Sequence, residues 1–169
     1  GKKMYWVGGD GHWKNPQHWS LTDGGLPVGC VPGPLDSVYF TNLSGSTAVQ
    51  VEFGDSVVQF HSIFCSNSTL PISFSGNNKP IQAMGSIVFT PQVTWSVSKK
   101  IALYGAATTY LIQTSSQPIS FLSLLGGGTW TLVDTLNGGT LSIVHGQLYA
   151  RNKGMELFYL VDNLNEWQD

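Results

Sequence analysis

Short segments that alternate apolar and polar residues, with glycine between them, constrain this chain most. They are clearest between Leu125 and Asn152, where segments such as Thr129–Val133 and Thr140–Val144 are separated by Gly-Gly, Asn-Gly-Gly and His-Gly sequences. Alternation places every second side chain on one face of a β-strand. Glycine supplies the tight corners between strands without steric cost. Strands this short, turned this often, are typical of a chain that winds in coils.

The same pattern of short alternating segments begins at Asp36, and the corners between the segments indicate a repeat of roughly 20 residues. A small internal echo, PISF, occurs at Pro71–Phe74 and again at Pro118–Phe121. We therefore predict an all-β fold, a right-handed parallel β-helix (β-solenoid). A β-sandwich, which also has short strands at regular spacing, is the alternative. The expected strands are Ser37–Thr41, Ala48–Phe53, Val57–Cys65, Pro71–Ser75, Ile81–Thr90, Val93–Val97, Ile101–Tyr104, Thr109–Gln113, Ile119–Leu124, Thr129–Val133, Thr140–Val144 and Gln147–Ala150. The apolar segment near the C-terminus is a candidate for a final strand.

The first 36 residues differ from the rest because they are rich in Trp, Gly and Pro. Gly and Pro interrupt every window in which a long helix could form. A compact cap over the open end of the sheets would bury Trp6, Trp13 and Trp19 and cover an exposed strand edge. We expect Asp10 to hold a turn of this cap, and His18 to pack beside a tryptophan. The prediction is one domain, 1–169, with a cap at 1–36 and coils at 37–169.

Composition excludes several classes of function. Charged residues make up 11% of the chain, against about 25% in a typical soluble domain. The net charge is −2, and no basic patch offers a surface for nucleic acid or anionic lipid. No apolar run is long enough to insert into a membrane. A surface of Gly, Ser, Thr and Asn is common in secreted β proteins. Without a leader sequence, we expect a processed or excised part of a larger chain.

The two cysteines, Cys30 and Cys65, are too far apart for a CxxC redox or zinc motif. In an exported chain, a disulfide between them is the simplest expectation. Such a bridge would stabilise the fold by roughly 3–4 kcal/mol in the chain-entropy model. The alternative is two buried free thiols that act as small apolar groups.

Two motifs near the start carry a resemblance to a known family. The pattern W-x-G-G-x-G-x-W-x-x-P-x-H-W-S spans Trp6–Ser20, and G-G-x-P-x-G-C-x-P-G-P-x-D-x-V-x-F spans Gly24–Phe40. Both resemble the opening of large surface proteins of Bacteroidetes, the gliding-motility-associated and adhesin-like proteins exported by the type IX route. Gly128–Leu136 and Gly139–Leu148 are similar to the second half of that family's unit, and the related opening of autotransporter passenger regions also precedes a β-solenoid.

This resemblance implies a non-catalytic structural or adhesive module at the bacterial cell surface. Its partners would be a surface polysaccharide or another adhesive ligand, together with neighbouring domains of the same chain. The family pattern also places a cysteine before Pro-Gly-Pro and another after an early strand, which fits Cys30 and Cys65.

Metal sites have weak support in the sequence, and we expect no cofactor. Asp10 lies in a glycine turn, and Asp23 and Asp36 are the nearest carboxylates that could join it around a calcium ion. His12 and His18 have no recognised metal-ligand spacing.

Catalysis has similarly weak support, so we predict that the chain is not an enzyme. Polysaccharide-cleaving β-helices need paired carboxylates. The candidates in the coils are Glu52, Asp55, Asp134, Glu156 and Asp162. Glu52 and Asp55 lie close together at a corner, whereas Asp134 is expected to be structural. Arg151 and Lys153 are too few to stabilise a carbanion, and no nucleophile elbow or phosphate-binding loop is present.

Carbohydrate binding through exposed aromatic rings is the alternative function. The candidates that we favour are Tyr104, Tyr110 and Tyr149, with Tyr39 and Tyr159 also considered. The opposing interpretation is that these rings stack inside the coils. Thr129 and Thr131 suggest the threonine ladders of ice-binding solenoids, but they do not recur at a fixed register. A polysaccharide-degrading enzyme is the third hypothesis.

Overall fold

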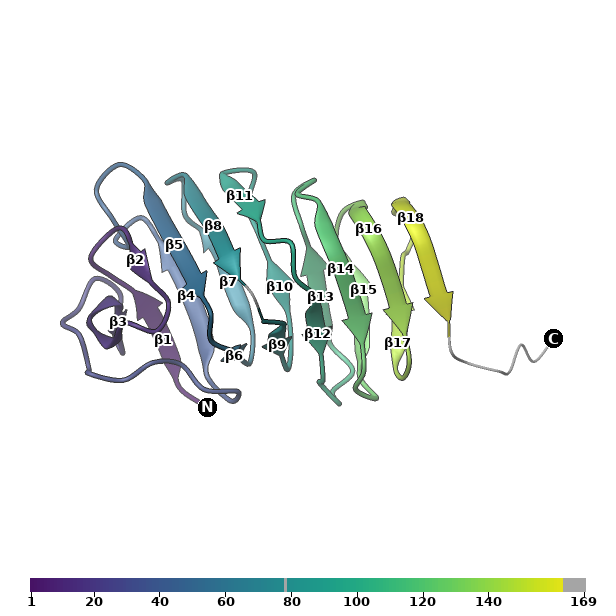
Figure 1. Cartoon of the computed structure of the whole chain (residues 1–169), viewed down its shortest axis with the longest axis horizontal. Helices are drawn as coiled ribbons and strands as arrows, with labels where there is room; N and C mark the ends of the chain where they lie inside the picture. Colours follow the sequence, from purple (N-terminus) through teal and green to yellow (C-terminus); the bar gives the residue numbers. More distant parts are fainter. Residues whose placement is uncertain (78, 163–169) are drawn as a thin grey trace.

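The computed structural model describes residues 1–77 and 79–162, which wind into a β-solenoid of about five turns (Figure 1). Within these residues the strands form three sheets, here called A, B and C. Sheet A contains Lys3–Trp6 (β1), Trp19–Ser20 (β3), Ser37–Thr41 (β4), Ile63–Asn67 (β7), Ile87–Val88 (β10), Tyr110–Gln113 (β13), Thr129–Leu132 (β15) and Gln147–Tyr149 (β17). Sheet B contains Gly11–His12 (β2), Val49–Gly54 (β5), Ile72–Asn77 (β8) and Val93–Ser96 (β11). Sheet C contains Val58–Phe60 (β6), Ile81–Ala83 (β9), Ile101–Leu103 (β12), Ile119–Leu124 (β14), Leu136–Ile143 (β16) and Met155–Asp162 (β18).

Neighbouring strands run parallel, and the one antiparallel pair among the described residues is β1 with β3. Sheet A has the order β17-β15-β13-β10-β7-β4-β1-β3, sheet B the order β11-β8-β5-β2, and sheet C the order β18-β16-β14-β12-β9-β6. Each sheet therefore takes one strand from successive coils. The predicted β-solenoid is confirmed, and the alternative β-sandwich, whose strands would pair mainly antiparallel, is wrong.

Helices contribute almost nothing to the fold. In the described part of the chain the helical segment is a single 3₁₀ turn, Pro16–His18 (η1). The Asn15 side chain accepts a hydrogen bond from the Gln17 amide at its start. No helix among the described residues is long and apolar enough to cross a membrane.

In-register pairing builds the core. In sheet A the aligned positions Val38, Ile63, Ile87 and Ile112 are all buried, and so are Ile81, Ile101, Leu122 and Leu141 in sheet C. Because equivalent positions on stacked strands point the same way, each inward column is continuous and apolar. Successive coils bury one another's inner faces, as in other solenoids.

The coils shorten along the rod. The aligned positions Val38, Ile63, Ile87 and Ile112 lie 25, 24 and 25 residues apart. Tyr110, Trp130 and Leu148 lie only 20 and 18 apart. Sheet B ends at β11, so the later coils connect sheet A to sheet C without a strand in sheet B. The expected repeat of roughly 20 residues thus fits the later coils. The two PISF segments are not equivalent, because they begin strands of different sheets, β8 and β14.

A column of glycines forms the corner between sheet C and sheet A. Its members, Gly85, Gly105, Gly126 and Gly146, lie 20, 21 and 20 residues apart. A Cβ atom at Gly105 would overlap with the carbonyl oxygen of Met84, and one at Gly126 with that of Gly105. The corner needs glycine because consecutive coils approach there backbone to backbone.

The three tryptophans of the first segment are buried beneath its loops. The rings of Trp6 and His18 stack with centroids 4.6 Å apart, and those of Trp13 and Trp19 meet edge to face at 4.8 Å. Trp6 Nε1 donates to the carbonyl of Gly9 (2.7 Å), and Trp19 Nε1 donates to that of Trp13 (2.8 Å). His18 Nδ1 lies 2.8 Å from the Val7 carbonyl. Since a carbonyl only accepts, Nδ1 carries the proton.

This first segment is more than a cover. Strand β3 pairs with β1 and covers the edge of sheet A, as a cap would. However, β1 and β2 also pair in parallel with β4 and β5. Residues 1–36 therefore supply the first rungs of sheets A and B, in addition to covering the edge of sheet A.

The expected disulfide is wrong, because both cysteines are free. Cys65 lies on β7, where the alternation that buries Ile63 also points Cys65 into the core. Cys30 lies in the exposed segment between β3 and β4. One thiol faces the core and the other faces solvent, so their side chains do not have the facing geometry of a disulfide.

Substituting Gly126 should destabilise the protein, whereas substituting its neighbour should not. In Gly126→Ala the new methyl group overlaps with the carbonyls of Tyr104 and Gly105, which should cost about 1–3 kcal/mol, as overpacking does. Gly127→Ala is the matched control, because its methyl group meets nothing within 4 Å. Thermal unfolding followed by circular dichroism would compare the two melting temperatures. Equal melting temperatures would contradict the close approach of coils at this corner.

The two thiols should differ in reactivity. A chromogenic disulfide reagent should label Cys30 in the folded protein and should reach Cys65 only after unfolding in guanidinium. Burial raises the pKa of the Cys65 thiol, which further suppresses the reactive thiolate. Cys30→Ser, as the control, should remove the native signal. If neither thiol reacted before reduction, the free-thiol geometry would be refuted.

Candidate functional site

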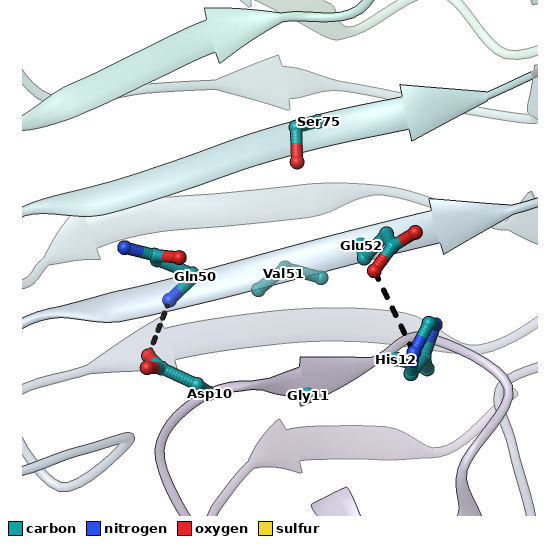
Figure 2. Close-up of a pocket in the computed structure, with 7 residues that line it drawn as sticks. All are labelled: Asp10, Gly11, His12, Gln50, Val51, Glu52 and Ser75. Atoms are coloured by element: carbon teal, nitrogen blue, oxygen red, sulfur yellow. Dashed lines mark hydrogen bonds and ion pairs between the residues drawn. The ribbon is translucent and has the colours of Figure 1, made fainter.

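A shallow depression of about 160 Å³ lies on the outer face of sheet B, at the capped end of the rod. Figure 2 shows it between β2, β5 and β8, with side chains converging from a loop and three strands. Its lining residues are Asp10, Gly11, His12, Gln50, Val51, Glu52 and Ser75.

Alternation on β5 produces this face. Val49, Val51 and Phe53 are buried, so Gln50 and Glu52 point outward and are exposed. Pairing then aligns Ser73 of β8 with Gln50, and Ser75 with Glu52. On the other side, β2 aligns His12 with Glu52. The depression is thus a direct product of register.

Two interactions fix the polar groups of the depression. Asp10 Oδ1 accepts a hydrogen bond from the backbone amide of Gln50 (2.8 Å), which ties the first loop to β5. His12 Nε2 lies 3.5 Å from Glu52 Oε2. The side chains of His12 and Glu52 are 65% and 54% exposed, so both remain open to a ligand.

The other carboxylates considered for a metal site do not join Asp10. Asp23 accepts a hydrogen bond from Thr41 Oγ1 (2.6 Å), and Asp36 accepts from the amides of Lys2 and Gly33. His18 stacks on Trp6, apart from His12, which faces Glu52. No group of three or more His, Cys, Asp or Glu side chains that could hold a metal ion exists among the described residues.

Among the described carboxylates that were considered for catalysis, Glu52 lines the depression and the others do not. Asp55 lies at the corner after β5, outside the depression. Asp134 accepts hydrogen bonds from the amides of Thr114 (3.0 Å) and Ser115 (2.6 Å). Because Ser115 has a φ of 50°, in the left-handed region, Asp134 supports a strained corner of the preceding coil. The side chains of Glu156 and Asp162 lie outside the described part of the chain.

The tyrosines considered for sugar binding lie in different surroundings. Tyr149 is exposed on the outer face of sheet A, aligned with Thr131. Tyr110 is aligned with the buried Trp130, and their ring centroids are 5.2 Å apart. Tyr104 is exposed at the corner after β12.

The Tyr39 ring stacks between Tyr5 and Phe64, with centroids 5.1 and 5.2 Å away, so both of its faces are covered. The Tyr159 side chain lies outside the described residues.

Sequence reasoning identified Asp10, His12 and Glu52 individually but did not bring them together, and it missed Gln50 and Ser75. The alternation in VQVEFG and ISFS marks the outward residues of β5 and β8. No comparable signal showed that the two-residue strand β2 would lie beside them.

No protein-family model, curated protein or solved structure matches the chain. The candidate site is therefore defined by its geometry, and the family resemblance in the sequence stays a prediction.

Asp36 has the clearest electrostatic perturbation among the carboxylates. Partial burial raises its pKa, but the hydrogen bonds from the Lys2 and Gly33 amides, with the positive charge of Lys2, outweigh burial and lower the pKa overall. These bonds measure 2.8 and 3.0 Å and hold the turn before β4 against the start of β1. The interaction is near the surface, so its contribution to stability is modest.

Asp36 should make stability depend on pH in the acid range. A carboxylate with a lowered folded pKa contributes stability that is present above its unfolded pKa, about 3.9, and is lost as pH falls through the folded pKa. Asp36→Asn should therefore lower the melting temperature at pH 7, and the difference from the wild type should shrink below about pH 4. Melting curves from neutral to strongly acidic pH would test this. A difference that stayed constant with pH would contradict it.

Proposed function

We propose that the chain is a non-catalytic structural or adhesive module of a large bacterial cell-surface protein, presented outside the cell as a stiff β-rod. Its partners are surface polysaccharides or other adhesive ligands, and neighbouring domains of the same protein. Gliding and type IX export come from the resemblance of Trp6–Ser20 and Gly24–Phe40, and they are part of the proposal.

The observation that carries the proposal is the unbroken stacking of coils. Sheet A continues from β3 to β17, and each strand bonds to the next. In such a stack the backbone hydrogen bonds run along the rod, so a force along the axis is shared by the two or three strands of each rung. A rod of this kind supports a surface role.

Two further features support the extracellular setting. Charged residues are scarce, at 11%, and uncharged polar residues take their place on the surface. The capped edge at β3 also prevents the first strand of sheet A from pairing with another chain.

Adhesion under flow tests the proposal. Beads that carry the chain should remain on a surface coated with polysaccharide from a gliding Bacteroidetes species, at shear rates that remove albumin-coated beads. Because many weak contacts act together on a bead, retention should exceed the control at least tenfold. No retention above albumin would overturn the adhesive role.

A separate assay tests the proposal that the chain is not an enzyme. Incubation of the chain with the same polysaccharide, with pectin and with alginate should release no reducing ends or unsaturated products above a heated control. Release that was lost in Glu52→Gln would instead support the polysaccharide-degrading hypothesis.

A further inference from the structure

The outer face of sheet B carries two parallel rows of hydrogen-bonding side chains, here called the polar face. One row contains Asp10, Gln50, Ser73 and Thr94, and the other contains His12, Glu52, Ser75 and Ser96. In-register strands place neighbours in a row about 4.8 Å apart, and the rows lie about 6.6 Å apart. All of these residues except Ser73, which is half-buried, are exposed.

Most of the hydrogen-bonding capacity of this face is available to solvent. One carboxylate oxygen of Asp10 accepts from the backbone amide of Gln50. The Glu52 carboxylate lies 3.5 Å from His12, and over half of the Glu52 side chain is exposed. Carboxylates accept hydrogen bonds, while the Gln50 side-chain amide and the serine hydroxyls both donate and accept. The polar face therefore offers closely spaced acceptors with donors between them.

The chemistry of the polar face selects among ligands. The depression is lined by two carboxylates and no Lys or Arg, which disfavours anionic polymers. It contains no aromatic ring besides the His12 imidazole, so it is not a stacking platform. A polymer rich in hydroxyl groups fits best, since adjacent hydroxyls donate to carboxylates and accept from amide and hydroxyl groups.

From this arrangement we propose that the polar face binds a neutral polysaccharide, which lies across β2, β5, β8 and β11 with one sugar in the depression. The depression, about 160 Å³, is smaller than the pockets that enclose whole ligands. Binding is thus weak per site, with a dissociation constant on the order of 1 mM. The proposal rests on the proposed adhesive function, in which many copies act together.

A nuclear magnetic resonance titration of the whole chain tests this site. The probes are cellohexaose, laminarihexaose and mannohexaose, with hexagalacturonate as the anionic comparison. At least one neutral hexasaccharide should shift the amide signals of β2, β5, β8 and β11 saturably, and hexagalacturonate should not. Glu52→Gln should weaken binding about tenfold, as loss of a charge-assisted hydrogen bond does.

Gln147→Ala is the matched control, since Gln147 is an exposed polar residue on sheet A. It should leave the affinity unchanged, and the spectra of both variants report whether the fold is intact. No saturable shift with any neutral hexasaccharide would overturn the proposal. So would shifts centred on Tyr104 or Tyr149, or stronger binding of hexagalacturonate.

The bead experiment and the titration fail independently. If wild-type beads do not adhere, the adhesive function is wrong, whatever the titration shows. If wild-type beads adhere but the titration does not map to sheet B, adhesion stands and the polar face is not its site.

Discussion

The structure depends on parallel strands that pair in register from coil to coil. In-register pairing places equivalent side chains in columns, so a polar residue at one inward position would lie against apolar neighbours above and below. The columns Val58–Ile81–Ile101–Leu122–Leu141 and Val49–Ile72–Val93 satisfy this requirement. Two of the buried hydroxyls, Ser62 and Ser86, lie instead at the corner between sheets C and A, where Ser62 Oγ accepts from the Ser86 amide and Ser86 Oγ accepts from the Leu111 amide. Consecutive coils are therefore joined by apolar contacts in the core and by hydrogen bonds to buried hydroxyls at this corner.

The sequence predicted this architecture because its signals are local. Alternation locates β4, β14 and β15 to within one residue, and glycine marks the corners of the later coils. Two of the predicted strands each correspond to two shorter strands, which belong to different sheets. Val57–Cys65 divides at His61 and Ser62 into β6 and β7, and Ile81–Thr90 divides into β9 and β10. The first of these corners has no glycine or proline, so periodicity alone did not reveal it.

Features that depend on distant segments were harder to predict. The disulfide expectation used the count and context of the cysteines, but strand phase decides that Cys65 faces the core. The depression requires β2, β5 and β8 to align across more than 60 residues, from Gly11 to Ser75. The alternation within each strand identifies its outward residues. Which outward residues of different strands become neighbours depends on the length of each coil. Coil length in turn varies from 25 to 18 residues between aligned positions.

The loss of sheet B along the rod divides the molecule into two parts. Beyond β11 the Gln117 side chain occupies the edge, where its oxygen accepts a hydrogen bond from the Trp95 amide (2.9 Å). This contact satisfies an amide that a further strand would otherwise pair with, so sheet B ends without an open donor at that position. The coils that follow are shorter because they connect sheets A and C directly. The polar face is consequently confined to the capped, three-sided part of the rod, and the two-sided part extends the stack without it.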